Sequence, residues 1–295
     1  MHRLEAGGEQ ASPPKGPPSS PLREGLALTF LIAASKSDPA AQNIVENLLR
    51  LHPFKAGEPR GGISVYEAGN VKLALFEGEA VHAENLDEVF PEVEAIAFAS
   101  RHESESLQST LTVHAPGNLT TQAAHGGQPL QLAYTWPQRM SLALKTLSRL
   151  APEGFKVSLE ATHHGPTSLT KPVWFVEIGS SLEQWRNEEA GRAVAEALWA
   201  SVEGQPEGRA AVGFGGGHYA PKHSRVTLEG EYAVGHIFPK YALTSKPDRR
   251  LVEQAFEKTL GGCRVAVVDW KGLPGEVRRS LLGLLEELGV EVVRV

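Results

Sequence analysis

The chain has 295 residues, a formal net charge of −6 and one cysteine, Cys263. The net charge argues against general adhesion to nucleic acids, DNA included, and a single cysteine excludes an internal disulfide and a zinc site made of several thiolates. No apolar run reaches the roughly 18 residues that a membrane helix needs. We therefore expect a protein with no membrane span that works in a reducing cytoplasm.

The first 24 residues differ from the rest of the chain in composition. They are rich in proline, glycine, serine and charged side chains, and such a segment buries too little apolar surface to offset the entropy lost on ordering. We predict a disordered tail over residues 1–24 and a single catalytic α/β domain over residues 25–295.

Strand and helix patterns alternate along that domain. Strands are predicted at residues 26–33, 94–100, 111–114, 157–164, 173–178, 210–214, 231–234, 264–269 and 290–295, with a hairpin over 64–76. Helices are predicted at 39–51, 137–150, 182–202, 247–260 and 275–288, the third of them behind a Ser180-x-x-Glu183 capping box. Long crossovers between strands favour a mostly parallel sheet covered by helices on both faces.

Three polar clusters that contain histidine follow or end predicted strands. They are Glu160–Pro166, Gly213–Lys222 and Gly235–Lys240, and the last two share the pattern Gly-His-x-x-Pro-Lys. In the first cluster, a carboxylate beside an imidazole can fix its tautomer and raise its basicity, as a general base or a metal ligand requires. The alternative is a strand-end histidine pair satisfied by the backbone. We favour function because further histidines, His102, His114, His218 and His236, also lie near strand ends.

The second cluster carries three consecutive glycines, Gly215, Gly216 and Gly217. Their backbone N–H groups could face a phosphate or the oxyanion of an acyl-transfer reaction, whereas a tight turn would explain one or two of the glycines. A dinucleotide fingerprint is excluded because its last glycine position holds His218. Lys222 and Lys240 each follow a proline and could contact phosphates, although lone surface lysines commonly have no such role.

Charge is unevenly distributed. Residues 67–105 contain ten acids against Lys72 and Arg101, whereas residues 218–250 contain six lysines and arginines against three acids. A polyanion would be repelled by the first stretch and attracted by the second. Two solvated faces of opposite sign would give the same pattern.

These motifs together resemble the archaeal-type D-aminoacyl-tRNA deacylases, a family that plants share. The matching stretches are Ser100–Ser104, Leu111–His114 with Gly117-Asn118, Glu160–Pro166, Glu177–Ser180, Gly213–Lys222, Gly235–Lys240 and Asp269–Gly272. They extend over everything except the tail. The resemblance implies a three-layer α/β sandwich around a mixed sheet, similar to nucleoside phosphorylases and peptidyl-tRNA hydrolases. It also implies zinc-dependent hydrolysis of the ester between a D-amino acid and the acceptor end of tRNA.

The resemblance suggests roles for individual residues. We expect two or three of four histidines, with Glu160 or Glu177, to hold zinc and leave one position for water, with the Gly215–Gly217 amides on the oxyanion. The four histidines are His102, His163, His164 and His218. Lys222, Lys240 and His236 would contact the 3′ end of the RNA. A metal-free version, with an imidazole as base, stays open.

Three further expectations complete the sequence-based interpretation. We expect a monomer. A hydrolase or phosphorylase of the same fold that acts on peptidyl-tRNA or a nucleoside is the first alternative function, since a fold does not fix chemistry. A non-catalytic protein that binds the 3′ end of tRNA is the second.

Overall fold

The computed structural model describes residues 28–243 and 246–295. The tail predicted over residues 1–24 lies outside the described residues, as do the first two residues of the strand predicted at 26–33. Among the helices that are described, none is both long and apolar enough to span a bilayer.

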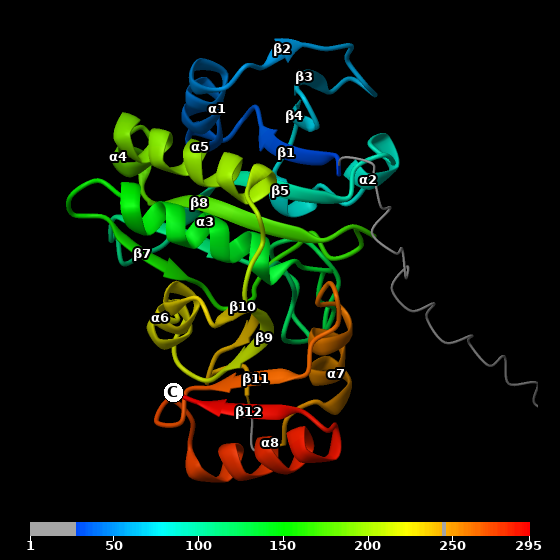
Figure 1. The fold of residues 1–295 in the computed structure, drawn as a ribbon, viewed down its shortest axis with the longest axis vertical. Helices are drawn as coiled ribbons and strands as arrows, with labels where there is room; N and C mark the ends of the chain where they lie inside the picture. Colours follow the sequence, from blue (N-terminus) through cyan, green and yellow to red (C-terminus); the bar gives the residue numbers. More distant parts are fainter. Residues whose placement is uncertain (1–27, 244–245) are drawn as a thin grey trace, which may run out of the picture.

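The larger of two sheets has eight strands in the order β2-β3-β4-β1-β5-β8-β6-β7 (Figure 1). These strands are β1 (Phe30–Ser35), β2 (Lys55–Ala56), β3 (Ser64–Ala68), β4 (Val71–Phe76), β5 (Ala95–Glu103), β6 (Thr110–His114), β7 (Lys156–Leu159) and β8 (Val173–Ser180). Neighbours β4, β1, β5 and β8 run parallel, whereas β3 pairs antiparallel with β4 and β6 pairs antiparallel with β8. The mostly parallel, mixed sheet predicted from the sequence is confirmed.

The last third of the chain forms a separate sheet of four parallel strands in the order β10-β9-β11-β12. Its strands are β9 (Arg209–Phe214), β10 (Tyr232–Phe238), β11 (Val265–Val268) and β12 (Glu291–Arg294). Figure 1 shows this sheet below the larger one, and α3 contacts both β6 and β7 of the larger sheet and β9 and β10 of the smaller one.

Helices cover the sheets as the alternation of apolar residues requires. The main helices are α1 (Pro39–Leu51), α3 (Pro137–Leu150), α5 (Glu188–Glu203), α6 (Pro221–Glu229), α7 (Arg249–Glu257) and α8 (Gly275–Glu287). Along β1, Ile32 and Ala34 pack against α1, α3 and α5, whereas Leu31 and Ala33 pack on the other face against η1 (Ala80–His82) and α2 (Leu86–Val89). Helices α7 and α8 cover the outer face of the smaller sheet.

The first helix begins where the sequence predicts. The carboxylate of Asp38 accepts hydrogen bonds from the backbone N–H groups of Ala40 and Ala41, and Pro39 occupies the first turn, where no donor is needed. Asp38 also accepts from the backbone N–H of Arg101 (2.8 Å). The cap therefore ties α1 to the end of β5, where the site described below begins.

Two predicted elements have different boundaries. The helix predicted over 182–202 is two helices, α4 (Leu182–Trp185) and α5. Its capping box is formed by Ser181 and Gln184, not by Ser180 and Glu183, because Ser180 still belongs to β8 and its hydroxyl donates to the carbonyl of Gln108. The strand predicted over 157–164 ends at Leu159, so the first histidine cluster lies in a loop.

The region around the glycine loop also differs from the prediction. Helix α6 was not predicted, and it places Lys222 in a first helical turn. Strand β10 extends four residues beyond the predicted end at Val234, so His236 lies inside a strand.

Candidate active site

The ends of neighbouring strands bring four titratable side chains together. His102 lies near the end of β5 and His114 ends β6, whereas Glu177 lies within β8 and Glu160 directly follows β7. Residues Ser100 and Thr112 pair with Glu177 from its two neighbouring strands, which sets the register of this end of the sheet. The fifth side chain, His218, comes from the loop after β9 and therefore from the smaller sheet.

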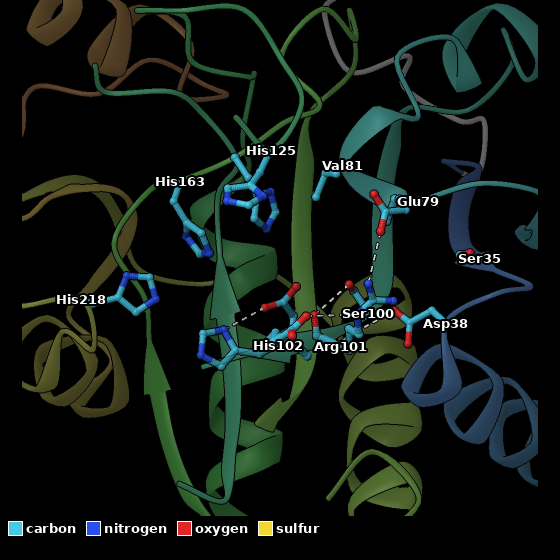
Figure 2. A pocket seen from close by; sticks show the side chains of 14 residues that line it. Ser35, Asp38, Glu79, Val81, Ser100, Arg101, His102, His125, His163 and His218 are labelled. Atoms are coloured by element: carbon cyan, nitrogen blue, oxygen red, sulfur yellow. Dashed lines mark hydrogen bonds and ion pairs between the residues drawn. The ribbon is translucent and has the colours of Figure 1, made fainter. Parts of the chain in front are cut away.

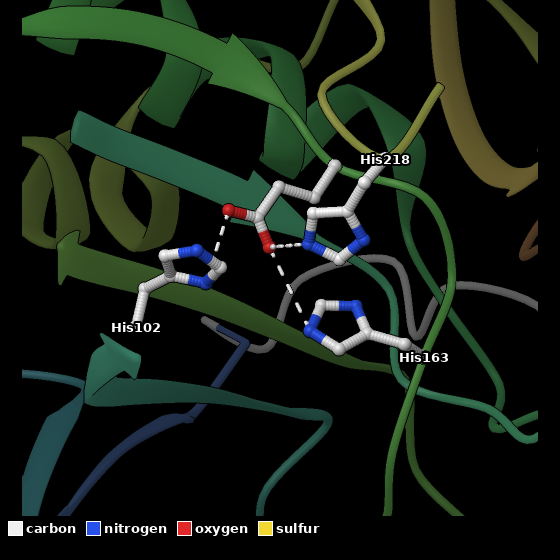
Figure 3. A group of neighbouring side chains, drawn as sticks. His102, His163 and His218 are labelled. Atoms are coloured by element: carbon white, nitrogen blue, oxygen red, sulfur yellow. Dashed lines mark ion pairs between the residues drawn. The ribbon is translucent and has the colours of Figure 1, made fainter. Parts of the chain in front are cut away.

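Three imidazoles surround the carboxylate of Glu160. Figure 3 shows the rings of His102, His163 and His218 around one carboxylate group. His102 Nδ1 lies 3.2 Å from Glu160 Oε1, and His163 Nε2 and His218 Nε2 lie 3.6 and 3.4 Å from Glu160 Oε2. The Glu160 side chain is 0% exposed, and its oxygens accept no hydrogen bond of good geometry from a described residue. A buried carboxylate in this situation is costly unless a cation stabilises it.

The orientation of His163 shows that this ring does not supply the positive charge that would stabilise the Glu160 carboxylate. Its Nδ1 lies 2.8 Å from the carbonyl oxygen of Ala161, so Nδ1 carries the hydrogen. Desolvation lowers the pKa of His163 well below its usual value, and His114 and His164 act in the same direction. The neutral ring then points the lone pair of Nε2 at the carboxylate of Glu160. Two electron-rich atoms that face each other are the arrangement expected of metal ligands.

The surroundings of His102 also favour the protonated, positively charged form of its ring. Burial opposes protonation of this ring, but Glu177 and Glu160 outweigh it and raise the pKa of His102 to about 10. Burial acts to raise the pKa of Glu177, but His114 and His102 hold it well below its usual range. The hydroxyl of Tyr219 lies 3.0 Å from His102 Nε2 and fixes the ring from its far side.

Next to this centre lies a second group of imidazoles, made of His114, His163 and His164, whose ring nitrogens lie within 4.8 Å of one another. Burial, with His114 as neighbour, lowers the pKa of His164 to about 4, so that ring is neutral near neutral pH. The backbone of His164 has a φ of 47°, a left-handed conformation that is uncommon for residues other than glycine. Such outliers persist where the surroundings hold them, and they are frequent at functional sites.

The centre opens into a cavity of about 500 Å³ (Figure 2). One wall carries imidazoles, namely His125, His163, His164 and His218. The other wall is mainly acidic, with Asp38, Glu79 and Glu103 against Arg101, whereas Glu177 lies buried beside His102 and His114. The Arg101 guanidinium lies 3.2 Å from Glu79 and so offsets one of these charges.

The structure brings together three of the histidines predicted to hold metal and the predicted catalytic residue Glu160. His102, Glu160, His163 and His218 offer ligand atoms within 4.8 Å of one another. Glu177 lies behind them, 3.6 Å from His102 Nδ1.

The glycine loop only partly matches its predicted role. The N–H of Gly215 donates to the carbonyl of Phe238 (2.7 Å), and the N–H of Gly216 donates more weakly to that of Gly272 (3.4 Å). Gly217 N–H makes no hydrogen bond within the described residues. One of the three amides therefore faces no competing acceptor.

Two of the predicted RNA contacts have protein partners instead. His236 is 0% exposed and lies with Nε2 3.0 Å from the carbonyl of Ala133 and Nδ1 3.2 Å from the hydroxyl of Thr162. The amino group of Lys222 donates to Asp269 Oδ1 (2.6 Å) and to the carbonyl of Val295 (3.1 Å). Lys240, in contrast, is exposed.

Several residues of the site were not predicted from the sequence as members of it. Tyr219 and Tyr241 hold the far nitrogens of His102 and His218, with the Tyr241 hydroxyl 3.3 Å from His218 Nδ1. His125 lines the cavity from a loop with no strand pattern. Tyr219 directly follows His218, and this adjacency is the one signal that could have suggested it.

A carboxylate–imidazole centre beside a cavity, at the strand ends of a mostly parallel sheet, defines an α/β enzyme. The D-aminoacyl-tRNA deacylase model matches residues 89–293. The chain is 38% identical to the D-aminoacyl-tRNA deacylase of Aeropyrum pernix over 276 residues, which are 90% of this chain and 99% of that protein. The chain therefore belongs to the D-aminoacyl-tRNA deacylase family, and the resemblance seen in its motifs is confirmed.

Other similarities agree with this assignment. The D-aminoacyl-tRNA deacylase of Pyrococcus horikoshii is 38% identical over 274 residues, with 90% of this chain and 99% of that one covered. A crystal structure of a conserved protein of unknown function is 33% identical with a TM-score of 0.83, over 90% of this chain and 95% of that one. The futalosine hydrolase of Helicobacter pylori, with a TM-score of 0.41 and 13% identity over 60% of this chain and 99% of that one, is too distant for a functional comparison.

Proposed function

We propose that this protein hydrolyses the ester bond between a D-amino acid and the terminal ribose of tRNA, and so releases the free amino acid and reusable tRNA. Family membership supports the reaction. The observation that carries the proposal in the structure is the buried carboxylate of Glu160, surrounded by His102, His163 and His218 at the edge of a cavity.

The cofactor that we propose is zinc. Imidazole nitrogens and carboxylate oxygens, without thiolates, are a common zinc ligand set in hydrolases. The unpartnered oxygens of Glu160 and the lone pair of His163 Nε2 that faces them fit such an ion. When bound, zinc supplies a Lewis acid that polarises the ester carbonyl and lowers the pKa of a water ligand to about 7.

The side chains of the site divide the remaining work. His163 and His218 lie at the cavity wall, where they can hold the ion and contact the ester, and neutral His164 lines the same wall beside them. The Gly217 N–H can donate to the carbonyl oxygen as negative charge develops on it, and a donor of this kind contributes about 3–4 kcal/mol to catalysis in other hydrolases. His102 and Glu177 position Glu160 from behind.

The RNA would approach from the side of Lys240. This lysine is exposed. It lies beside the glycine loop because its backbone N–H donates to the carbonyl of Gly216 (2.9 Å). The acidic wall on the opposite side of the cavity would repel phosphates.

One assay tests the proposal against its rivals. The protein is incubated with D-Tyr-tRNA, L-Tyr-tRNA and N-acetylated Tyr-tRNA, and release of the amino acid is followed. Preferential cleavage of the D-ester is expected. Cleavage of the blocked esters alone would show a peptidyl-tRNA hydrolase, and tight binding without turnover would show a tRNA-end binder.

A second measurement tests zinc. Treatment with a chelator should abolish turnover, and added zinc should restore it. Full activity after verified removal of metal would favour an imidazole acting directly as the base. We further propose that the protein acts as a monomer in the cytoplasm, which sedimentation and cell fractionation can check.

A further inference from the structure

Lys240 and Tyr241 form an exposed platform next to the centre. They are the two middle residues of a turn in which the N–H of Ala242 donates to the carbonyl of Pro239 (3.0 Å). A further hydrogen bond, from Lys240 N–H to the carbonyl of Gly216 (2.9 Å), fixes the turn to the glycine loop.

The ring of Tyr241 combines exposure with a fixed position. Its residue is 63% exposed, and no other aromatic residue of the described chain occurs among the strongly exposed large apolar side chains. Its hydroxyl lies 3.3 Å from His218 Nδ1, so the ring extends from the centre toward solvent. An aromatic face held in this way suits the stacking of a nucleobase.

The other aromatic side chain considered for stacking is already covered. The ring of Trp270 has guanidinium groups of Arg278 and Arg294 at 4.5 and 4.0 Å from its centroid. Protein cations therefore occupy the contacts that a base would need there.

The distribution of charge around the cavity also favours a nucleotide beside Tyr241. The amino group of Lys240 forms no ion pair within the described residues, so it is available to a phosphate at the cost of little desolvation. The far wall of the cavity contains Asp38, Glu79 and Glu103 against the single cation of Arg101, so its excess of carboxylates would repel the same phosphate. The nucleotide end of a substrate is thus favoured at Lys240 and excluded from the acidic wall.

We propose that the Lys240–Tyr241 turn is the binding site for the terminal nucleotide of the acceptor end. The base stacks on the ring of Tyr241, and the 5′-phosphate of that nucleotide contacts the ammonium group of Lys240. The aminoacyl group then enters the cavity past His218. This inference rests on the proposed function and adds a subsite for a single-stranded nucleotide to it.

Steady-state kinetics on D-Tyr-tRNA test the subsite with four variants. Tyr241→Ala removes the ring, and we expect it to raise KM about tenfold. Tyr241→Phe keeps the ring and should keep KM near that of the wild type, whereas kcat reports any role of the hydroxyl at His218. Lys240→Ala should raise KM and reduce the slope of log KM against log salt by about 0.7. Lys55→Ala, an exposed lysine in β2, is the matched control and should change neither constant.

The outcomes separate failure of the subsite from failure of the proposed function. A wild-type protein that releases no D-tyrosine would overturn the function itself. Normal turnover together with a wild-type KM in Tyr241→Ala would overturn the stacking role alone. A KM raised equally in Tyr241→Ala and Tyr241→Phe would also refute it, because the ring would then not be the group that binds.

Discussion

Glu160 and Tyr219 pair through their backbones in an antiparallel bridge, although they follow strands of different sheets. The N–H of Ala161 donates to the carbonyl of His218 (2.8 Å), and the N–H of Ala220 donates to that of Leu159 (3.0 Å). This bridge places the imidazole of His218 over the carboxylate of Glu160. The centre is therefore assembled by contact between the two sheets.

The first prediction concerns Glu160. Glu160→Gln keeps the shape of the side chain and removes its charge, so we expect it to lose bound zinc and to lower kcat more than about 100-fold. Zinc content after dialysis and the rate of D-Tyr-tRNA hydrolysis check this. His82→Ala removes an exposed histidine outside the centre and is the control. Normal zinc content and rate in Glu160→Gln would contradict the assignment.

Tyr219 provides a second test. Tyr219→Phe removes the hydroxyl that lies 3.0 Å from His102 Nε2 but keeps the packing of the ring. Because this hydroxyl orients the ring of His102, which positions the proposed ligand Glu160, we expect zinc affinity to fall about 10- to 100-fold, with kcat lowered at limiting zinc and KM little changed. Excess zinc should restore the rate. A loss that zinc does not restore would show a direct catalytic role instead.

The third prediction concerns stability and pH. Burial lowers the pKa of His236 to about 3 and that of His223 to about 4. Below the usual pKa of 6.5, the unfolded chain binds protons at these histidines and the folded chain does not, so the free energy of unfolding falls as pH decreases. Each histidine contributes a slope of up to about 1.4 kcal/mol per pH unit.

Denaturant titrations from about pH 7 to about pH 5 measure this slope. His236→Gln should make the slope shallower by about 1.4 kcal/mol per pH unit. The same change at exposed His82 should leave it unaltered, and identical slopes in the wild type and His236→Gln would refute the assignment of His236 as a buried neutral ring.

Gly126 offers a test of the loop that carries His125 beside the cavity. It has a φ of 73°, and a Cβ added there would lie 2.0 Å from the carbonyl oxygen of Val81, a residue that lines the cavity. We expect Gly126→Ala to cost about 3 kcal/mol of stability. Gly62 has a similar φ of 81° with no atom near its added Cβ, so Gly62→Ala should cost only about 1 kcal/mol. Equal losses measured by chemical denaturation would show that the contact with Val81 is unimportant.

Lys222 and Lys240 should respond differently to mutation. Lys222→Met breaks the contacts with Asp269 and Val295, so we expect a loss of about 1–2 kcal/mol in the free energy of unfolding with no change in KM for tRNA. Lys240→Ala should raise the KM for tRNA and leave the free energy of unfolding unchanged. A raised KM in Lys222→Met at unchanged stability would restore Lys222 as an RNA contact.

Much of the fold follows from local pattern. The cap at Asp38, the hairpin over β3 and β4 and the buried strands β5 and β8 were predictable, because capping geometry and apolar runs depend on neighbouring residues. The division into two sheets was not, since each sheet has the same strand and helix patterns. Pairing between strands distant in sequence leaves no mark on either strand alone.

Contacts with distant parts of the chain also limit what the sequence predicts for single residues of the site. Glu160, His163 and His218 were predictable because histidine and carboxylate at strand ends have few structural uses. His236 has the same neighbours in sequence as His218, Gly-His-x-x-Pro-Lys, yet lies fully buried in β10. The difference arises from Thr162 and Ala133, which accept or donate at its ring and belong to other parts of the chain.

The bridge between Glu160 and Tyr219 also bears on how such a centre can be inherited. A shortened ancestor that possessed only the eight-stranded sheet would have carried His102, Glu160 and His163 without the third imidazole. The loop after β9 supplies the missing ring only when the second sheet is docked in this register. Recombination that exchanges either sheet with an unrelated partner would therefore separate His218 from Glu160 even where both halves fold.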